Sequence, residues 1–300
     1  MKNIFVFFAA LALSMTACST KESSCTYKDL PVAWEELTSY DFVEAVKKSG
    51  GVAVIPMAVV EKHGQHLPVG TDIFVGREIA LRAAEMEYCI VFPYHLVAQN
   101  FVAMAYPGTV AHTADIMYRW LDETCRELAR NGIKKIIFLN SHGGNAWSIP
   151  FFLQQQLESP RDYVVYFSSA SPDSAANARI RALTRATSDG HGGENETSLI
   201  MAIRPDLVKM EHAADEKFTA ESLLPSVVSN WTGIRWFQRY PNHIAGDPRT
   251  ATKELGEAII QGRVEGLARV IREVKNDQTT LKLQQEFFRR SQAPLEAVRR

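Results

Sequence analysis

Two carboxylates and two imidazoles occur within the stretch from Glu61 to Asp72, which reads EKHGQHLPVGTD. Glu61 and His63 are two residues apart, so in an extended chain their side chains point to the same side. Carboxylate oxygen combined with imidazole nitrogen suits zinc, manganese or iron(II), whereas calcium and magnesium sites take oxygen almost alone. A polar loop with incidental histidines has the same composition, so this stretch alone indicates only a candidate metal site.

Two further polar clusters follow apolar runs. Residues 140–145 (NSHGGN) place His142 just after one such run, and residues 190–198 (GHGGENETS) open another. His142 could instead cap a helix, and a glycine-rich turn could hold phosphate, but the GxGxxG and Walker patterns are absent. Carboxylates in the first turn of a helix also suit capping and the helix dipole, which accounts for Glu196 but not for His191.

The elements that must position these clusters alternate along the chain. The apolar runs typical of buried parallel strands are Val52–Pro56, Cys89–Pro93, Lys135–Asn140 and Tyr163–Ser168. The stretches with helical spacing are Phe74–Glu87, Ala114–Asn131, Ala146–Leu157 and Thr252–Val274. This alternation predicts an α/β fold with βαβ units and a parallel sheet. Because chemistry collects beyond the carboxyl ends of such strands, we expect Glu61 and His142 to lie at one edge.

Taken together, the three clusters resemble the three signatures of the creatininase family. Tyr106–Thr109 (YPGT) is similar to that family's aromatic-Pro-Gly-Thr loop, and Gly246–Pro248 with Ala251 is similar to its late Gly-Asp-Pro segment. The likeness runs in the same order from Val32 to Val274. It implies a metal-dependent amidohydrolase with a three-layer α/β/α sandwich and a mainly parallel sheet, often assembled as a homo-oligomer, in particular a hexamer.

The resemblance also implies a set of metal ligands. Glu61, His63, Asp72 and His142 match family ligands, with Asp72 bridging two divalent ions, for which zinc is expected and manganese or iron are alternatives. In creatininase itself a glutamate stands two residues after the histidine of the third strand, where this chain has Gly144. Many other members have glycine there and a glutamate in the His-Gly-Gly-Glu signature, which predicts Glu194 as the fifth ligand.

The implied function is hydrolysis of a C–N bond in a cyclic or linear small-molecule amide by a metal-bound hydroxide. His191 is predicted to serve as the catalytic acid or base with Glu196 as its partner, although a structural hydrogen bond is the alternative for His191. Gly144 counts against creatinine as the substrate, as do Gln99–Asn100 and Ala103, which replace residues common on the family's substrate side. The competing hypothesis is a membrane-tethered protein of the same fold that binds a ligand or metal without turnover.

The amino-terminal residues predict export. Lys2 precedes the apolar run 4–13, and small residues then lead to Cys18, as in a secretory signal. A cysteine in that position resembles a bacterial lipoprotein signal, with Cys18 lipidated and the protein anchored at the periplasmic or cell surface. Plain cleavage nearby is the alternative. The predicted organisation is a signal segment (1–18), a tether (19–31), one amidohydrolase domain (32–275) and a helical or loose tail (276–300).

Charge and cysteine content narrow the partners. With 33 basic and 34 acidic residues the formal net charge is −1, which argues against a nucleic-acid partner, because such proteins usually carry a basic surplus. Besides Cys18 the chain has Cys25, Cys89 and Cys125, an odd number that cannot form a full disulfide framework. Cys89 and Cys125 lie in strand-like and helix-like runs, so we expect buried thiols without a catalytic role.

Overall fold

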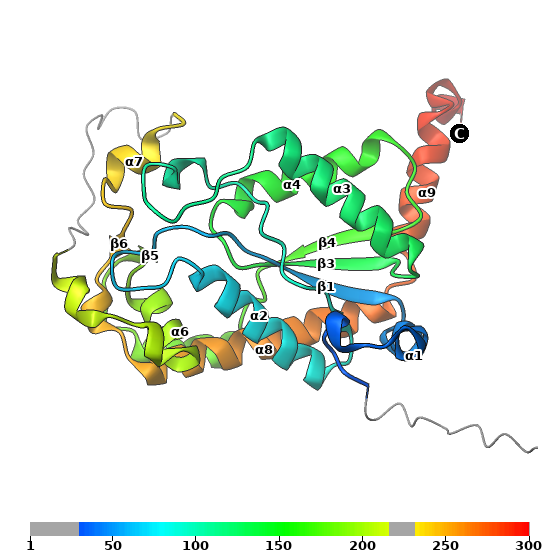
Figure 1. The fold of residues 1–300 in the computed structure, drawn as a ribbon. Helices are drawn as coiled ribbons and strands as arrows, with labels where there is room; N and C mark the ends of the chain where they lie inside the picture. The colour runs from blue at the N-terminus through cyan, green and yellow to red at the C-terminus, as the bar shows by residue number, and fades with distance from the viewer. Residues whose placement is uncertain (1–29, 216–231, 300) are drawn as a thin grey trace, which may run out of the picture.

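A computed structural model describes residues 30–215 and 232–299. The predicted signal segment and residues 19–29 of the predicted tether lie outside this range. The centre of the fold is a four-stranded parallel sheet in the order β2-β1-β3-β4 (Figure 1). Its strands are β1 (Val52–Met57), β2 (Ile90–Val91), β3 (Lys135–Asn140) and β4 (Val164–Ser168).

Helices cover both faces of this sheet. The chain forms α1 (Ser39–Ser49), α2 (Thr71–Met86), α3 (Ala114–Arg130), α4 (Asn145–Gln155), α5 (Ser174–Leu183), α6 (Glu194–Ile203), α7 (Arg235–Arg239), α8 (Lys253–Asn276) and α9 (Thr280–Ser291). In Figure 1, α3 and α4 lie above the sheet, and α2, α6 and α8 lie below it. A short antiparallel pair, β5 (Asp189–His191) with β6 (Ala245–Gly246), lies with α7 at the end of the molecule toward which β4 points.

The alternation of side chains along the strands explains these layers. Val52 and Val54 of β1 belong to the core beneath the sheet, whereas Ala53 and Ile55 belong to the core above it. Successive strand residues point to opposite faces, and both faces are covered by helices, so the strands are apolar throughout. The predicted three-layer α/β/α sandwich with a parallel sheet is confirmed.

The boundaries differ in a few places. Strand β2 is shorter than the predicted Cys89–Pro93, since Pro93 has no backbone N–H to continue the ladder. The charged tail after residue 275 contains α9, of which Phe288 is buried. Cys89 and Cys125 are buried free thiols, as expected. Within residues 30–215 and 232–299, no helix combines the length and apolar character needed to cross a membrane.

The contact between α6 and α8 is close because a glycine stands at the crossing. A Cβ added at Gly256 would lie 1.9 Å from the backbone oxygen of Ser198. The hydroxyl of Ser198 also accepts a hydrogen bond from the backbone N–H of Thr252 at 3.0 Å. Helix α6 carries part of the polar cluster at residues 190–198, so this contact helps to position it.

We therefore expect Gly256→Ala to lower the free energy of unfolding by about 1–3 kcal/mol, because overpacking against backbone outweighs the better helix propensity of alanine. Chemical denaturation monitored by circular dichroism measures the change. Glu257→Ala, on the exposed side of the same helix, is the matched control and should change stability little. Equal stability of the two variants would contradict the close contact.

Candidate metal centre

The polar clusters meet at the carboxyl edge of the sheet. Glu61 and His63 lie in the loop after β1, and His142 lies in the turn between β3 and α4. Asp72 and Glu196 lie in the first turns of α2 and α6. The first four are buried, and Glu196 is partly exposed. The parallel sheet thus brings residues that are far apart in the sequence to one place.

Asp72 stands between two groups of possible ligands. Its Oδ2 lies 3.1 Å from Nδ1 of His142, which is also 3.1 Å from Oε1 of Glu61. On the other side, Oδ1 of Asp72 lies 3.1 Å from Nε2 of His63, which is 3.8 Å from Oε2 of Glu196. Within each triad the donor atoms lie within 4.8 Å of one another. Two ions bridged by Asp72 would match this arrangement.

The electrostatics of the cluster call for positive charge. Burial alone would raise the pKa of Glu61 and of Asp72, but the neighbouring histidines lower both, that of Glu61 strongly. Burial would likewise lower the pKa of His63, yet the carboxylates of Glu196 and Asp72 raise it to about 10. Burial raises the pKa of Glu196 to about 7, and the nearby carboxylates add to that rise. The carboxylates therefore need cationic partners, a role that divalent ions would also fill.

Two observations fit a metal better than a self-contained ion-pair network. Oδ2 of Asp72 is buried and accepts no hydrogen bond from the described residues. In addition, each histidine uses its remote nitrogen on a backbone oxygen. Nδ1 of His63 lies 3.2 Å from the carbonyl of Glu61, and Nε2 of His142 lies 2.7 Å from that of Gln99. Such bonds place the proton on the remote nitrogen and leave the other lone pair for a metal.

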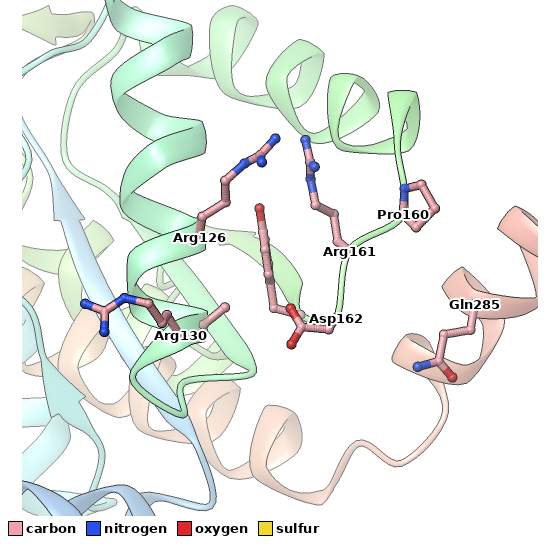
Figure 2. A pocket seen from close by; sticks show the side chains of 8 residues that line it. Arg126, Arg130, Pro160, Arg161, Asp162 and Gln285 are labelled. Atoms are coloured by element: carbon pink, nitrogen blue, oxygen red, sulfur yellow. The ribbon is translucent and has the colours of Figure 1, made fainter.

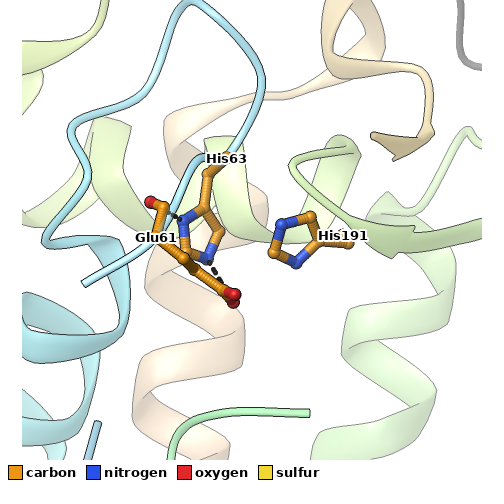
Figure 3. A group of neighbouring side chains, drawn as sticks. All are labelled: Glu61, His63 and His191. Atoms are coloured by element: carbon orange, nitrogen blue, oxygen red, sulfur yellow. Dashed lines mark hydrogen bonds and ion pairs between the residues drawn. The ribbon is translucent and has the colours of Figure 1, made fainter. Parts of the chain in front are cut away.

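His191 approaches the cluster from β5. Its ring stacks on that of His63, with centroids 4.4 Å apart, and Figure 3 shows it facing His63 and Glu61. Nε2 of His191 lies 2.8 Å from the carbonyl of Lys62, so the structural hydrogen bond considered above is present. That bond fixes the proton on Nε2 and leaves Nδ1 free, 3.8 Å from Oε2 of Glu196. Burial lowers the pKa of His191 to about 3, so the ring is neutral.

Glu194 does not lie where the resemblance to the family implied. Its carboxylate is buried and accepts hydrogen bonds from the backbone N–H groups of Arg185 (2.9 and 3.1 Å) and Ala186 (2.9 Å). It belongs to none of the candidate ion-binding groups among the described residues, whereas Glu196 does. Helix α6 begins at Glu194, so the two side chains leave the first turn in different directions and Glu194 points toward the loop before β5.

The glycine that replaces the alternative carboxylate has a steric reason. A Cβ at Gly144 would lie 2.2 Å from the backbone oxygen of Gln99 and 2.6 Å from Nε2 of His142. The hydrogen bond between His142 and Gln99 thus occupies the space that a side chain would need. A glutamate at this position is incompatible with the observed loop.

Two residues near the cluster had no assigned role in the sequence analysis. His243, between α7 and β6, is buried and has Nε2 3.5 Å from Oε2 of Glu61, and Trp236 of α7 contacts it. The only sequence signal was its position three residues before the Gly246–Pro248 segment. Tyr106, from the recognised YPGT loop, packs on His243 with ring centroids 4.9 Å apart.

A separate hollow of about 640 Å³ lies near the starts of β3 and β4 (Figure 2). Arginines dominate its lining, but Arg126 and Arg161 pair with Asp122, and Arg130 pairs with Glu127. Its lining residues are Arg126, Ala129, Arg130, Pro160, Arg161, Asp162, Tyr163 and Gln285. With their charges balanced, these side chains form a surface ion-pair network.

Comparison with known proteins agrees with this geometry. The family model described as Creatininase: Creatinine amidohydrolase matches residues 35–271. The creatinine amidohydrolase of Pseudomonas putida is 26% identical over 255 residues, covering 79% of this chain and 95% of that protein. The mycofactocin precursor peptide peptidase of Mycolicibacterium smegmatis is 26% identical over 237 residues, covering 77% and 88%. The solved structure named Creatininase Mn superposes with a TM-score of 0.67 at 25% identity, covering 82% of this chain and 100% of that one.

The placement of the two glutamates gives a direct test. Glu196→Gln should lower the metal content of the purified protein sharply, because an amide oxygen is a poorer donor than a carboxylate. Glu194→Gln is the matched control and should keep most of the metal, while the loop around residues 185–186 exchanges its amide hydrogens faster. Elemental analysis and hydrogen exchange measure the two effects. If Glu194→Gln loses the metal and Glu196→Gln retains it, the structural placement does not describe the ligand set.

Proposed function

The chain belongs to the creatininase family, and on this premise we propose that it is a metal-dependent amidohydrolase that hydrolyses a C–N bond of a cyclic or linear amide. The observation that carries the proposal is the pair of ligand triads that share Asp72. Relatives with different substrates, named for creatinine and for a precursor peptide, support hydrolysis as the common chemistry.

In this proposal Glu61, Asp72 and His142 hold one divalent ion, and His63, Asp72 and Glu196 hold the other. Glu196 thus takes the ligand role predicted for Glu194. Mixed nitrogen and oxygen donors suit zinc, with manganese or iron(II) as alternatives. The solved structures named Creatininase Mn and Zn-Zn type creatininase support the same choice of metals.

Bound ions would lower the pKa of a water molecule and polarise the amide carbonyl. Deprotonation and protonation fall to His191. Its free Nδ1 faces the cluster and can accept a proton from the attacking water, while the bond from Nε2 to Lys62 keeps the ring in place. Because the pKa of His191 is lowered to about 3, the protonated ring is a strong acid, which suits transfer of that proton to the leaving nitrogen.

The substrate is proposed to be a small amide other than creatinine. Gly144 cannot carry the carboxylate found at the matching position of creatininase, because Gln99 fills that space. Ala103, which stands where members often have a histidine, is fully buried. Both differences lie on the side of the site where the family's substrate-binding residues are expected, so the metal half and the substrate half of the family pattern are separable here.

We further propose that the protein is exported and held at the membrane by a lipidated Cys18, as a periplasmic or cell-surface lipoprotein, and that it acts as a homo-oligomer. The support for export is the sequence pattern of residues 1–18. The support for assembly is family resemblance.

Metal content and turnover test the proposed function together. The purified protein should contain up to two divalent ions per chain and should hydrolyse at least one member of a panel of lactams, cyclic ureides, formamides and short peptides, with creatinine turned over poorly. Asp72→Ala should lose metal and activity together, since it removes the bridge. Full metal content and full activity in this variant would exclude the two-metal centre. Metal binding without turnover of any panel member would favour the ligand-binding alternative.

The membrane anchor has its own test. Mass spectrometry of the mature amino terminus should find an acylated Cys18, and the protein should fractionate with membranes. Cys18→Ser should release it into the soluble fraction, whereas Cys25→Ser is the matched control and should not. An unmodified terminus beyond residue 18 would rule out lipidation and leave plain secretion.

A further inference from the structure

His243 has an unusual backbone conformation for a buried side chain. Its φ of 58° lies in the left-handed region, which residues other than glycine seldom adopt. The ring is nevertheless almost fully buried at the metal centre. Strained residues of this kind persist where the surrounding structure holds them and often serve a function.

We infer that His243, held by Trp236, is a positioning residue that binds one oxygen of Glu61 and so leaves the other oxygen to ligate the metal. This inference rests on the proposed metal centre, and it concerns residues that the resemblance to the family did not point to. The argument depends on which nitrogen of His243 carries its proton, on the orientation of Glu61, and on the packing around the ring.

The neighbouring indole fixes the proton of His243. Nε1–H of Trp236 donates to Nδ1 of His243 at 3.0 Å. An indole nitrogen can only donate, so Nδ1 must be an acceptor and cannot carry hydrogen. The neutral ring therefore carries its proton on Nε2, the atom that points toward Glu61.

That proton meets only one side of the Glu61 carboxylate. Nε2 of His243 lies 3.5 Å from Oε2, at the long end of the hydrogen-bond range. Oε1 instead faces the ligand cluster, 3.1 Å from Nδ1 of His142 and 4.0 Å from Nε2 of His63. A carboxylate held in this way ligates through one oxygen, which leaves a coordination position for water or substrate.

Aromatic rings on several sides keep the imidazole of His243 in place. Its centroid lies 4.5 Å from that of His191, in an edge-to-face arrangement, and 4.9 Å from that of Tyr106. The backbone N–H of His243 donates to the carbonyl of Tyr240 at 2.9 Å, which stabilises the turn. A histidine packed only to fill space would not need a donor behind it and a carboxylate in front of it.

The first experiment measures metal affinity with zinc alone. His243→Gly removes the imidazole and suits the left-handed backbone, so the variant should fold at least as stably as the unaltered protein. We expect its affinity for zinc to fall about 10–100-fold, as is typical when a group that orients a ligand is lost. Competition with a chromophoric chelator measures the affinity. An unchanged affinity would overturn the inference.

The second experiment observes the proton itself. In metal-free protein labelled with ¹⁵N at histidine, long-range correlation spectra distinguish a ring nitrogen that carries hydrogen from one that does not. His243 should show hydrogen on Nε2, and Trp236→Phe, which keeps the ring but removes its N–H, should yield a mixture of tautomers and weaker zinc binding. Trp120→Phe, at an exposed position on α3, is the control and should change neither. Hydrogen on Nδ1 in the unaltered protein, or an unchanged tautomer in Trp236→Phe, would overturn the inference.

The outcomes separate this inference from the proposed function. If the unaltered protein takes up no zinc, manganese or iron, the proposed function itself fails. If it binds zinc and hydrolyses an amide while His243→Gly binds zinc equally well, only the role of His243 fails.

Discussion

The arrangement of this protein depends on the cost of placing carboxylates close together away from water. Glu61 and Asp72 are buried, and Glu196 stands beside them. Each ion removed from water costs several kcal/mol unless opposite charge and hydrogen bonds compensate. The imidazoles of His63 and His142 supply part of that compensation, and the first turns of α2 and α6 place partial positive charge near Asp72 and Glu196.

The fold meets this requirement from two directions. The parallel sheet supplies the ligands that follow β1 and β3, and their positions are set by strands buried on both faces. The β5–β6 pair and α7 supply His191, Trp236 and His243 from the opposite side. The histidines of the first group donate to backbone oxygens and turn a lone pair inward, whereas His243 accepts from Trp236 and turns a proton inward. The centre therefore has both acceptors and a donor in fixed positions.

The sequence was most informative where an element's period determines the geometry. Strand runs ending before Glu61 and His142 imply one shared edge, because parallel strands place their carboxyl ends together. The choice between Glu194 and Glu196 could not be made in this way. It depends on the residue at which α6 begins and on two backbone N–H groups, at Arg185 and Ala186, whose proximity only the folded loop reveals. His243 was also out of reach, since a lone histidine acquires meaning only from its left-handed backbone and its contact with Trp236.

The close approach of Gln99 to Gly144 also constrains how such sites can diverge. A carboxylate donor two residues after the strand histidine and a hydrogen bond from that histidine to the Gln99 carbonyl compete for the same volume. Replacing Gly144 alone would break the bond that orients His142 before any new donor could be used. Evolution from one carboxylate arrangement to the other therefore requires the loop around Gln99 to move first, and the effect of a mutation at position 144 depends on that earlier change. Such epistasis would keep lineages with the two arrangements apart even where every other ligand is shared.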